Sequence, residues 1–472
     1  MVQRIIGRFT EQKMIESCLN SSKAEFVAVY GRRRVGKTFL MRQYFNDKFD
    51  FYITGVYQAS LKEQLRNFAE QLSIQTSQYS PIPKNWHEAF GILKNYLSSL
   101  KKSKVVIFFD ELPWLDTPRS GFIRELDYFW NSWGAQQTNL KFFVCGSATT
   151  WMTNNLIGAK GGLHNRLTHN IRLNPFTLRE TEAYLQAQRM AWDRYTITEC
   201  YMIFGGIPYY LSLLRPDMSL SQNVDTLFFG PSGELKDEFG FVFQSLFNNS
   251  TLYRRIVELL SSKAKGLTRE EIIAGLKLGK GGTLTEALQN LESCDFLRKY
   301  HAYGKKERGV LYQLIDNFSL FYLKFVGNVH GADPHAWSHM TDTPKLRAWR
   351  GYAFEQICLQ HLPQVKKALG IDGILTTTSA WTGSDGDNKG QIDLVIDRND
   401  RTINLCEMKF SQMAFEITKD YHRTLIERME LFRKLTKTTK SLTLIMISIY
   451  GIKQNMYSNA IQREIVADDL FR

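Results

Sequence analysis

Hydrophobic positions follow two alternating patterns along the first 175 residues of the chain. Short runs that are apolar at nearly every position predict strands buried on both faces, whereas apolar residues three and four apart predict amphipathic helices. The predicted strands are 26–30, 51–54, 104–110, 141–145 and 170–173, and the predicted helices include 61–72 and 86–100. This alternation is typical of an α/β domain with a parallel sheet.

The loop after the first predicted strand has the spacing of a phosphate-binding loop. Its glycines allow backbone N–H groups to turn toward an anion, and the helix that follows points its positive N-terminus at the same place. The expected nucleotide-binding residues are Gly31, Arg32, Arg33, Arg34, Val35, Gly36, Lys37 and Thr38. We expect Lys37 to reach the β- and γ-phosphates of ATP and the Thr38 hydroxyl to hold Mg²⁺.

Polar side chains stand at the ends of two later predicted strands, where an open α/β sheet binds its ligand. Asp110 and Glu111 follow the apolar run 105–109. We expect Asp110 to hold Mg²⁺ through water and Glu111 to polarise the attacking water, the alternative being a solvated turn. Ser147, or a threonine just after it, could sense the γ-phosphate or position this water; equally, it could cap a helix.

The middle of the chain, residues 250–315, has the pattern of a winged helix. Helical patterns at 252–260, 268–276 and 283–293 precede two strands, 296–303 and 310–315, around a charged turn. Residues 251–315 contain twelve Lys or Arg against seven Asp or Glu, which favours DNA contact through the third helix and the wing. The alternative is a plain spacer between domains.

Residues 346–472 carry a second group of candidate catalytic residues. The predicted elements are helix 349–362, a glycine-rich acidic loop 382–390, strands 391–397 and 402–410, helix 414–435 and strand 442–447. Glu355, Asp393 and Glu407 are expected to bind Mg²⁺ or Mn²⁺, and Lys409, on the same strand face as Glu407, to align a nucleophile or neutralise a phosphate. This is phosphodiester chemistry; the alternative is an ordinary hairpin with a surface ion pair.

The composition also indicates what kind of partner the protein binds and in which cellular compartment it works. The chain has 60 Lys and Arg against 47 Asp and Glu, a net charge of +13, which suits nucleic acid, although charge alone does not separate this from a merely basic protein. No apolar run is long enough to span a membrane and the start lacks the features of a signal peptide, so we expect a cytoplasmic protein. Six cysteines without a CxxC pair predict buried free thiols.

Six motifs in order give the first part of the chain a family resemblance. They are IGR with Glu11, GRRRVGKT, IFFDELPWL, CGSATTWM, HNRLTH and LNPFTLRET. Together they resemble the archaeal-type ATPases, of the STAND-like branch of AAA-related P-loop NTPases, over residues 1–330. The resemblance implies that Gly7 and Arg8 lie near the adenine and that Arg166 contacts the γ-phosphate, although a basic residue before a strand is as often a surface charge.

The last part of the chain resembles a different protein superfamily. Glu355, Gln391-Ile392-Asp393 and Glu407-Met408-Lys409 are similar to the PD-(D/E)XK, restriction-endonuclease-like superfamily in the order helix, strand, strand. Ile392 replaces the proline of that name. The resemblance implies a metal-dependent nuclease-like fold, with cleavage either retained or lost.

The sequence therefore predicts an α/β protein in five parts. They are a P-loop ATPase domain (1–175), a helical lid (176–249), a winged helix (250–315), a linker (316–345) and a nuclease-like domain (346–472). We expect a Mg²⁺-dependent ATPase whose nucleotide state controls the winged helix and the nuclease-like domain on nucleic acid. The alternatives are a signalling switch or scaffold with a protein partner and a DNA-binding initiator-like ATPase, each with an inactive tail; a homo-oligomer fits any of them.

Overall fold

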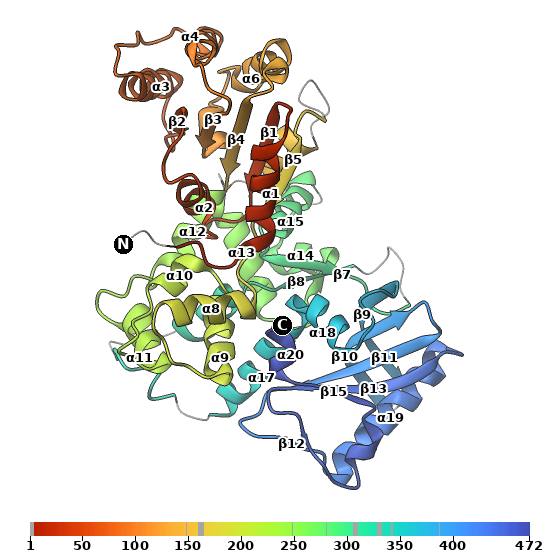
Figure 1. The fold of residues 1–472 in the computed structure, drawn as a ribbon. Helices are drawn as coiled ribbons and strands as arrows, with labels where there is room; N and C mark the ends of the chain where they lie inside the picture. Colours follow the sequence, from red (N-terminus) through yellow and green to blue (C-terminus); the bar gives the residue numbers. More distant parts are fainter. Residues whose placement is uncertain are drawn as a thin grey trace. The chain divides into compact units, whose positions relative to one another are not determined.

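The computed structural model describes residues 4–147, 149–158, 165–247, 249–279, 281–304, 310–327, 333–340, 343–386 and 388–472. The chain divides into two compact units, Met1–Pro175 and Phe176–Arg472, and each is described by itself (Figure 1).

The first unit is built on a five-stranded sheet in the order β2-β3-β4-β1-β5, with every neighbouring pair parallel. Its strands are β1 (Glu25–Tyr30), β2 (Phe51–Thr54), β3 (Val105–Asp110), β4 (Leu140–Gly146) and β5 (His169–Arg172). All five strands were predicted, and β4 is buried at every residue. The predicted α/β fold with a parallel sheet is confirmed, because apolar runs without alternation need cover on both faces.

Helices cover both faces of this sheet. They are α1 (Phe9–Asn20), α2 (Lys37–Tyr44), α3 (Leu61–Thr76), α4 (Trp86–Ser99), α5 (Leu112–Leu115), α6 (Phe122–Ser132) and α7 (Thr149–Met152), with short turns η1 (Gly134–Gln136) and η2 (Thr153–Ile157). Residues of α3, α4 and α6 share one core with β1 to β4. On the other face, the rings of Phe108 and Phe143 contact Phe49 and Phe45, which follow α2.

The second unit begins with helices. They are α8 (Leu178–Ala187), α9 (Arg194–Phe204), α10 (Pro208–Ser212), α11 (Leu220–Val224), η3 (Asp225–Phe229) and α12 (Glu238–Leu246). Thr177 and Glu180 form a capping box that begins α8, and Gly205, in the left-handed conformation, ends α9. These residue types explain where α8 starts and where α9 stops.

A small helical and antiparallel segment follows. It consists of α13 (Ser250–Ser261), β6 (Leu267–Thr268), α14 (Arg269–Leu276), α15 (Gly282–Ser293), β7 (Leu297–Tyr300) and β8 (Leu311–Leu314). The strands pair in the order β6-β8-β7, both pairs antiparallel. Thr268 and Glu271 form a capping box at the start of α14. Most of the expected wing turn, residues 305–309, lies outside the described residues.

The rest of the second unit packs helices against a mixed sheet in the order β15-β13-β11-β10-β9. The remaining elements are α16 (Asn317–Phe321), η4 (Tyr322–Val326), α17 (Pro344–Gln360), α18 (Leu362–Ala368), β9 (Thr376–Asp385), β10 (Asn388–Arg398), β11 (Thr402–Lys409), β12 (Phe415–Glu416), α19 (Lys419–Thr436), β13 (Ser441–Ser448), β14 (Ile452–Lys453), η5 (Ser458–Ala460), β15 (Arg463–Ile465) and α20 (Ala467–Leu470). The predicted hairpin is confirmed, because β10 and β11 pair antiparallel.

The loop predicted at residues 382–390 is wrong. Apart from Gly386, the described residues of this range extend β9 and β10, and Gly383 pairs with Gly390 across the two strands. A Cβ on Gly383 would lie 2.6 Å from the ring of Trp381, and one on Gly390 would lie 3.0 Å from it. The glycines therefore make room for a tryptophan above a strand pair, which a glycine-rich composition alone does not distinguish from a turn.

Two predicted helix starts are also wrong. The helix expected from residue 414 begins at Lys419, because Thr418 caps it and Phe415 and Glu416 form β12. The helix expected from residue 349 begins at Pro344, within the predicted linker. Thr343 caps it and the proline occupies its first turn, where a missing N–H costs no hydrogen bond.

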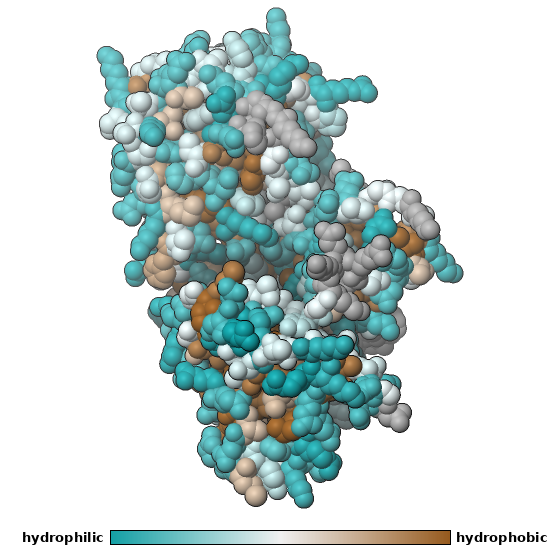
Figure 2. Space-filling model, turned by 90° about the vertical axis from the view of Figure 1, so that its right-hand side faces the viewer, coloured by the Kyte–Doolittle hydropathy of each residue, from teal (hydrophilic) through white to brown (hydrophobic). Residues whose placement is uncertain are grey.

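Within the part of the chain that is described, no helix combines the length and apolar character needed to cross a bilayer. The face in Figure 2 is mainly hydrophilic, with several separate hydrophobic areas. The six cysteines are all buried and free, as the sequence predicted.

Candidate functional site

The phosphate-binding loop joins β1 to α2, and two of its glycines adopt conformations that other residues avoid. Gly31 has φ of 152° and Gly36 has φ of 88°. A Cβ on Gly31 would lie 2.2 Å from the carbonyl oxygen of Leu173, so no other residue fits there without moving the backbone. The sequence pattern and the backbone geometry therefore agree on a loop shaped by glycine.

The side chain of Lys37 contacts the backbone at the start of this loop. Its Nζ donates to the carbonyl oxygens of Gly31, at 3.1 Å, and of Arg32, at 2.9 Å. Only 5% of Lys37 and 4% of Arg32 are exposed, whereas Arg33 and Arg34 are partly exposed. The ammonium group thus lies across the loop, where a phosphate oxygen can take the place of a carbonyl acceptor.

Thr38 and Asp110 meet although 72 positions separate them in the sequence. The Thr38 hydroxyl donates to the carboxylate of Asp110, at 2.9 Å to Oδ2 and 3.1 Å to Oδ1. Asp110 ends β3 and is 3% exposed. A hydroxyl and a carboxylate side by side are the oxygen donors that Mg²⁺ prefers, so these two residues fit a magnesium ion.

Glu111 and Ser147 form a second pair at the same edge of the sheet. Oε2 of Glu111 accepts hydrogen bonds from the Ser147 hydroxyl, at 2.8 Å, and from the Ser147 N–H, at 3.2 Å. Because β3 and β4 are parallel neighbours, the residues after them emerge together. The structure thus gives Ser147 a contact that the sequence did not predict, which is with the expected base.

The N-terminal segment is tied to the loop through Arg8. This residue adopts the left-handed conformation, with φ of 56°, and its Nη2 donates to the carbonyl oxygen of Val35 at 3.1 Å. Gln12 donates its side-chain N–H to the carbonyl oxygen of Gly7 at 2.8 Å. Arg8 therefore lies beside the phosphate loop. The expected position of Gly7 and Arg8 near the adenine stays a prediction.

Arg166 remains the least defined of the predicted residues. It is exposed, in the turn before β5. His164 of the same motif lies outside the described residues. The expected role of Arg166 at the γ-phosphate stays a prediction.

The C-terminal candidates come from three elements of the second unit. Glu355 is on α17, Asp393 is on β10 and Glu407 is on β11 with Lys409. The register of β10 against β9 shifts between Ile392 and Val395, so Asp393 lies at an irregularity of the kind that redirects a side chain.

Glu407 is the most heavily bonded of these carboxylates. Its Oε1 accepts from Lys409 Nζ at 2.7 Å and from the Tyr421 hydroxyl at 2.8 Å, and its Oε2 accepts from Arg428 Nη1 at 3.0 Å. Neither Tyr421 nor Arg428 was among the predicted site residues. They are seven residues apart, two helical turns, so their position on one face of α19 was the signal that they act together.

Burial and mutual repulsion change the protonation of the other two carboxyl groups. Burial, with the nearby charges of Asp393 and Glu407, raises the pKa of Glu355 to about 8, although Lys409 opposes the shift. Burial and Glu407 also raise the pKa of Asp393. Carboxylates that repel each other in this way gain from a bound cation, so they fit a metal ion chemically. Their oxygens do not all lie within 4.8 Å of one another, however.

A cavity of about 180 Å³ adjoins this cluster within the second unit. Glu355 and Asp393 line it together with Arg298 of β7 and Tyr300. Arg298 Nη2 donates to the side chain of Gln313, while its buried Nε has no hydrogen-bond partner among the described residues. Sequence reasoning missed Arg298 because its strand is far from the motifs; no local pattern marked it.

Comparison with known proteins identifies the first of these two regions. Residues 6–214 match the family model described as an ATPase domain predominantly from Archaea. The chain carries an archaeal-type ATPase domain. An ATPase domain implies a nucleotide and Mg²⁺ as cofactors, and Lys37, Thr38 and Asp110 lie inside the matched residues. The match does not reach Glu355, Asp393 or Glu407.

The chain is also similar to other proteins and solved structures over a longer stretch than this domain. The chain is 23% identical over 435 residues to the uncharacterised protein MJECL04 of Methanocaldococcus jannaschii, covering 90% of this chain and 92% of that protein. The Walker-type ATPase PABY2304 of Pyrococcus abyssi is 19% identical, with a TM-score of 0.47, covering 68% of this chain and 96% of that one. The ORC2 protein of Aeropyrum pernix is 12% identical, with a TM-score of 0.44, covering 72% and 96%.

Proposed function

We propose that this protein is an ATP-binding, Mg²⁺-dependent ATPase whose nucleotide state controls a winged helix and a nuclease-like domain that act on nucleic acid. One observation carries the ATPase part. The phosphate loop, the Thr38–Asp110 pair and the Glu111–Ser147 pair lie in one unit, on strand ends that share an edge of the sheet.

In this proposal the chain's own groups bind and orient the triphosphate. Backbone N–H groups of the loop hold the phosphates, and Lys37 exchanges its carbonyl acceptors for phosphate oxygens. Mg²⁺, when bound, neutralises charge on those oxygens. Glu111 accepts the proton of the attacking water, and Ser147 holds one carboxylate oxygen so that the other faces the water. Arg8 keeps the loop in place at Val35, and Arg166 supplies a further positive charge.

For the C-terminal cluster we propose metal-dependent hydrolysis of a phosphodiester. Glu355, Asp393 and Glu407 would hold Mg²⁺ or Mn²⁺, which lowers the pKa of its bound water. Lys409 would leave Glu407 to align the nucleophile or neutralise the phosphate. The support for this is that three carboxyl groups, Glu407 buried and the other two half-buried, gather near a lysine, an arrangement that a surface ion pair does not need.

The cavity beside the cluster suggests where a phosphate group would bind. Arg298 lines the cavity and its side-chain hydrogen bond goes to the neutral Gln313, so an oxyanion can accept from the guanidinium without breaking a carboxylate ion pair. We propose that Arg298 contacts the nucleic-acid backbone next to the bond that is cleaved.

The test is cleavage of single- and double-stranded DNA and RNA with Mg²⁺ or Mn²⁺, with and without ATP. Asp393→Asn should abolish cleavage. The matched control is Asp397→Asn, the same change on the same strand, because Asp397 instead bonds Lys440 at 2.5 Å and lies outside the cluster. Loss of cleavage in Asp393→Asn but not in Asp397→Asn supports nuclease activity. A change in the cleavage rate on adding ATP supports control of cleavage by the phosphate loop.

A second candidate function is a nucleotide-dependent switch or scaffold with an inactive tail. The observation that favours it is that Lys409, Tyr421 and Arg428 engage both oxygens of Glu407, which leaves this carboxylate little freedom to bind a metal. ATP hydrolysis without cleavage of any substrate would support this function. DNA affinity that falls steeply with salt and depends on residues 250–315 would instead support an initiator-like ATPase.

The proposed partner is nucleic acid, with DNA favoured by the charge of residues 251–315. A homo-oligomer, or a protein partner if the role is signalling, is compatible with the same ATPase.

A further inference from the structure

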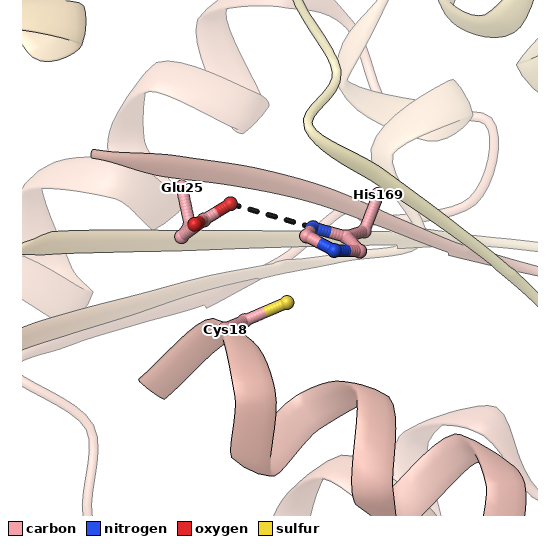
Figure 3. Close-up of side chains that lie close together, drawn as sticks. All are labelled: Cys18, Glu25 and His169. Carbon is pink, nitrogen blue, oxygen red and sulfur yellow. Dashed lines mark ion pairs between the residues drawn. The ribbon is translucent and has the colours of Figure 1, made fainter. Parts of the chain in front are cut away.

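Three potential metal ligands meet at the edge of the first sheet opposite to the phosphate loop. Glu25 is the first residue of β1 and His169 the first of β5, whereas the loop follows the other end of β1. Cys18 lies near the end of α1. Figure 3 shows the three side chains pointing toward one another from a helix and two adjacent strands.

The distances and burial suit a single ion. A sulfur, a carboxylate oxygen and an imidazole nitrogen from these residues all lie within 4.8 Å of one another. Cys18 is completely buried, Glu25 is 4% exposed, and the side chain of His169 is 35% exposed. The group is therefore enclosed on the protein side and open to solvent at the histidine, so an ion has an entry path and a position for water.

One buried oxygen in this group has no hydrogen-bond partner among the described residues. It is Oε2 of Glu25, which lies 3.4 Å from Nδ1 of His169. That separation is long for a charge-assisted hydrogen bond. In a tetrahedral zinc site with bonds of about 2.0 to 2.1 Å, oxygen and nitrogen ligands stand about 3.4 Å apart. The spacing therefore fits two ligands of one ion better than it fits a direct ion pair.

The nearby buried lysine has other partners. Lys141 is 1% exposed, and its Nζ donates to the carbonyl oxygens of Ser21 at 2.9 Å, Lys23 at 2.5 Å and Thr138 at 3.5 Å. These three acceptors account for all of its protons. Lys141 thus supplies positive charge near Glu25 but leaves the carboxylate oxygen without a donor.

We propose that Cys18, Glu25 and His169 bind Zn²⁺, with water as the fourth ligand. Sulfur, nitrogen and carboxylate oxygen together form a ligand set typical of zinc rather than of Mg²⁺. Binding replaces the thiol proton of Cys18, which passes to solvent. The ion joins the end of α1 to β1 and β5. Arg8 directly precedes the other end of α1 and bonds the phosphate loop at Val35, so zinc holds in place the helix that supports the nucleotide site.

The experiment is a titration of the metal-free, full-length protein with Co²⁺, followed by visible absorption. We expect one equivalent to give a thiolate-to-cobalt charge-transfer band and the strong d–d bands of tetrahedral cobalt, and Zn²⁺ to displace both. Cobalt at Thr38 and Asp110 would have oxygen ligands only and no such charge-transfer band. The readout therefore separates this site from the magnesium site of the ATPase domain.

Two pairs of variants decide the result. His169→Gln should weaken Co²⁺ and Zn²⁺ binding by about 100-fold or more, whereas His87→Gln, at an exposed histidine that pairs with Glu125, should leave it unchanged. Cys18→Ser should remove the charge-transfer band, whereas Cys294→Ser should keep it. A wild-type protein without the band, or a band that persists in Cys18→Ser, overturns the proposal. Because His169 is partly exposed, its variant should fold, and it tests the proposal even if Cys18→Ser does not fold.

Discussion

The phosphate loop and the C-terminal acidic cluster both belong to five-stranded sheets, yet they hold their charged groups in different ways. In the loop, residues 31–38 are consecutive, and Gly31 and Gly36 set the shape of the backbone. In the cluster, Glu355, Asp393 and Glu407 come from a helix and two strands, and their spacing depends on the packing of the second unit.

This difference shows what each region depends on. The loop presents backbone groups and one lysine to an anion, so its shape survives as long as the glycines stay. The cluster depends on a balance of charge, because Glu407 is held by Lys409 and Arg428 while Glu355 has its pKa raised to about 8. Substitutions in the loop should therefore have large and local effects, and those around the cluster should have graded effects.

The largest difference between the two regions is expected when the lysine of each is replaced and ATP affinity and cleavage are compared. Lys37→Ala should reduce ATP affinity by about 1,000-fold or more, because a buried charge pair with phosphate is lost. Lys409→Ala should leave ATP binding unchanged and lower nucleic-acid cleavage. Isothermal titration with ATP, next to a cleavage assay, measures both. Normal ATP binding by Lys37→Ala would refute the assignment of the phosphate loop.

Removing the expected base separates binding from chemistry in the ATPase domain. Glu111→Gln should keep ATP affinity and lower the rate of hydrolysis by about 100-fold or more, since an amide cannot accept the proton of water. Phosphate release under single-turnover conditions is the measurement. Glu70→Gln, at an exposed position on α3, serves as the control. Full turnover by the Glu111 variant would exclude this residue as the base.

The second unit contains a buried histidine whose titration should make its stability depend on pH. His361 is fully enclosed; its Nε2 accepts from the Leu178 N–H at 3.0 Å, and its Nδ1 lies 2.8 Å from the carbonyl oxygen of Ile357. Burial lowers the pKa of His361 to about 4, although the Ile357 contact opposes the shift. The unfolded chain therefore binds the proton first as the pH falls.

Protonation of His361 in the unfolded chain therefore destabilises the folded protein below the usual histidine pKa. Above that pKa the effect disappears. Between about pH 6.5 and pH 4 the free energy of unfolding should fall by about 3 kcal/mol. His361→Gln cannot titrate, so its stability should change less with pH over this range. Urea denaturation of both proteins at several pH values provides the comparison. Equal pH dependence in the two would show that His361 is not the cause.

The smallest predicted effect concerns the cavity next to the cluster. Arg298→Gln should weaken the binding of a single-stranded oligonucleotide by about 10-fold, because one charge-assisted contact to phosphate is lost. Lys299→Gln, at the exposed neighbour on the same strand, should change it less. Fluorescence anisotropy at fixed salt measures both affinities. Equal losses would indicate a general charge effect, not a specific contact.

The two regions differ in how far the sequence predicted them, and the reason is physical. A phosphate loop needs certain residues at fixed spacing, so Gly31, Lys37, Thr38 and the strand ending in Asp110 could be identified from the sequence. The pairing of Glu111 with Ser147 could not, because it depends on β3 and β4 lying side by side. In the second unit, the sequence did not identify Tyr421 and Arg428 as partners of Glu407, and it predicted a loop at the glycines beneath Trp381.

The sequence by itself determined the local features: the apolar strands, the helix caps at Thr177 and Thr268, and the glycine loop. Each of these depends on interactions between residues close in the chain. Only the tertiary structure decided which distant groups meet, such as Arg298 with the acidic cavity and Cys18 with Glu25 and His169. Packing brings such residues together, and no spacing along the chain encodes that proximity.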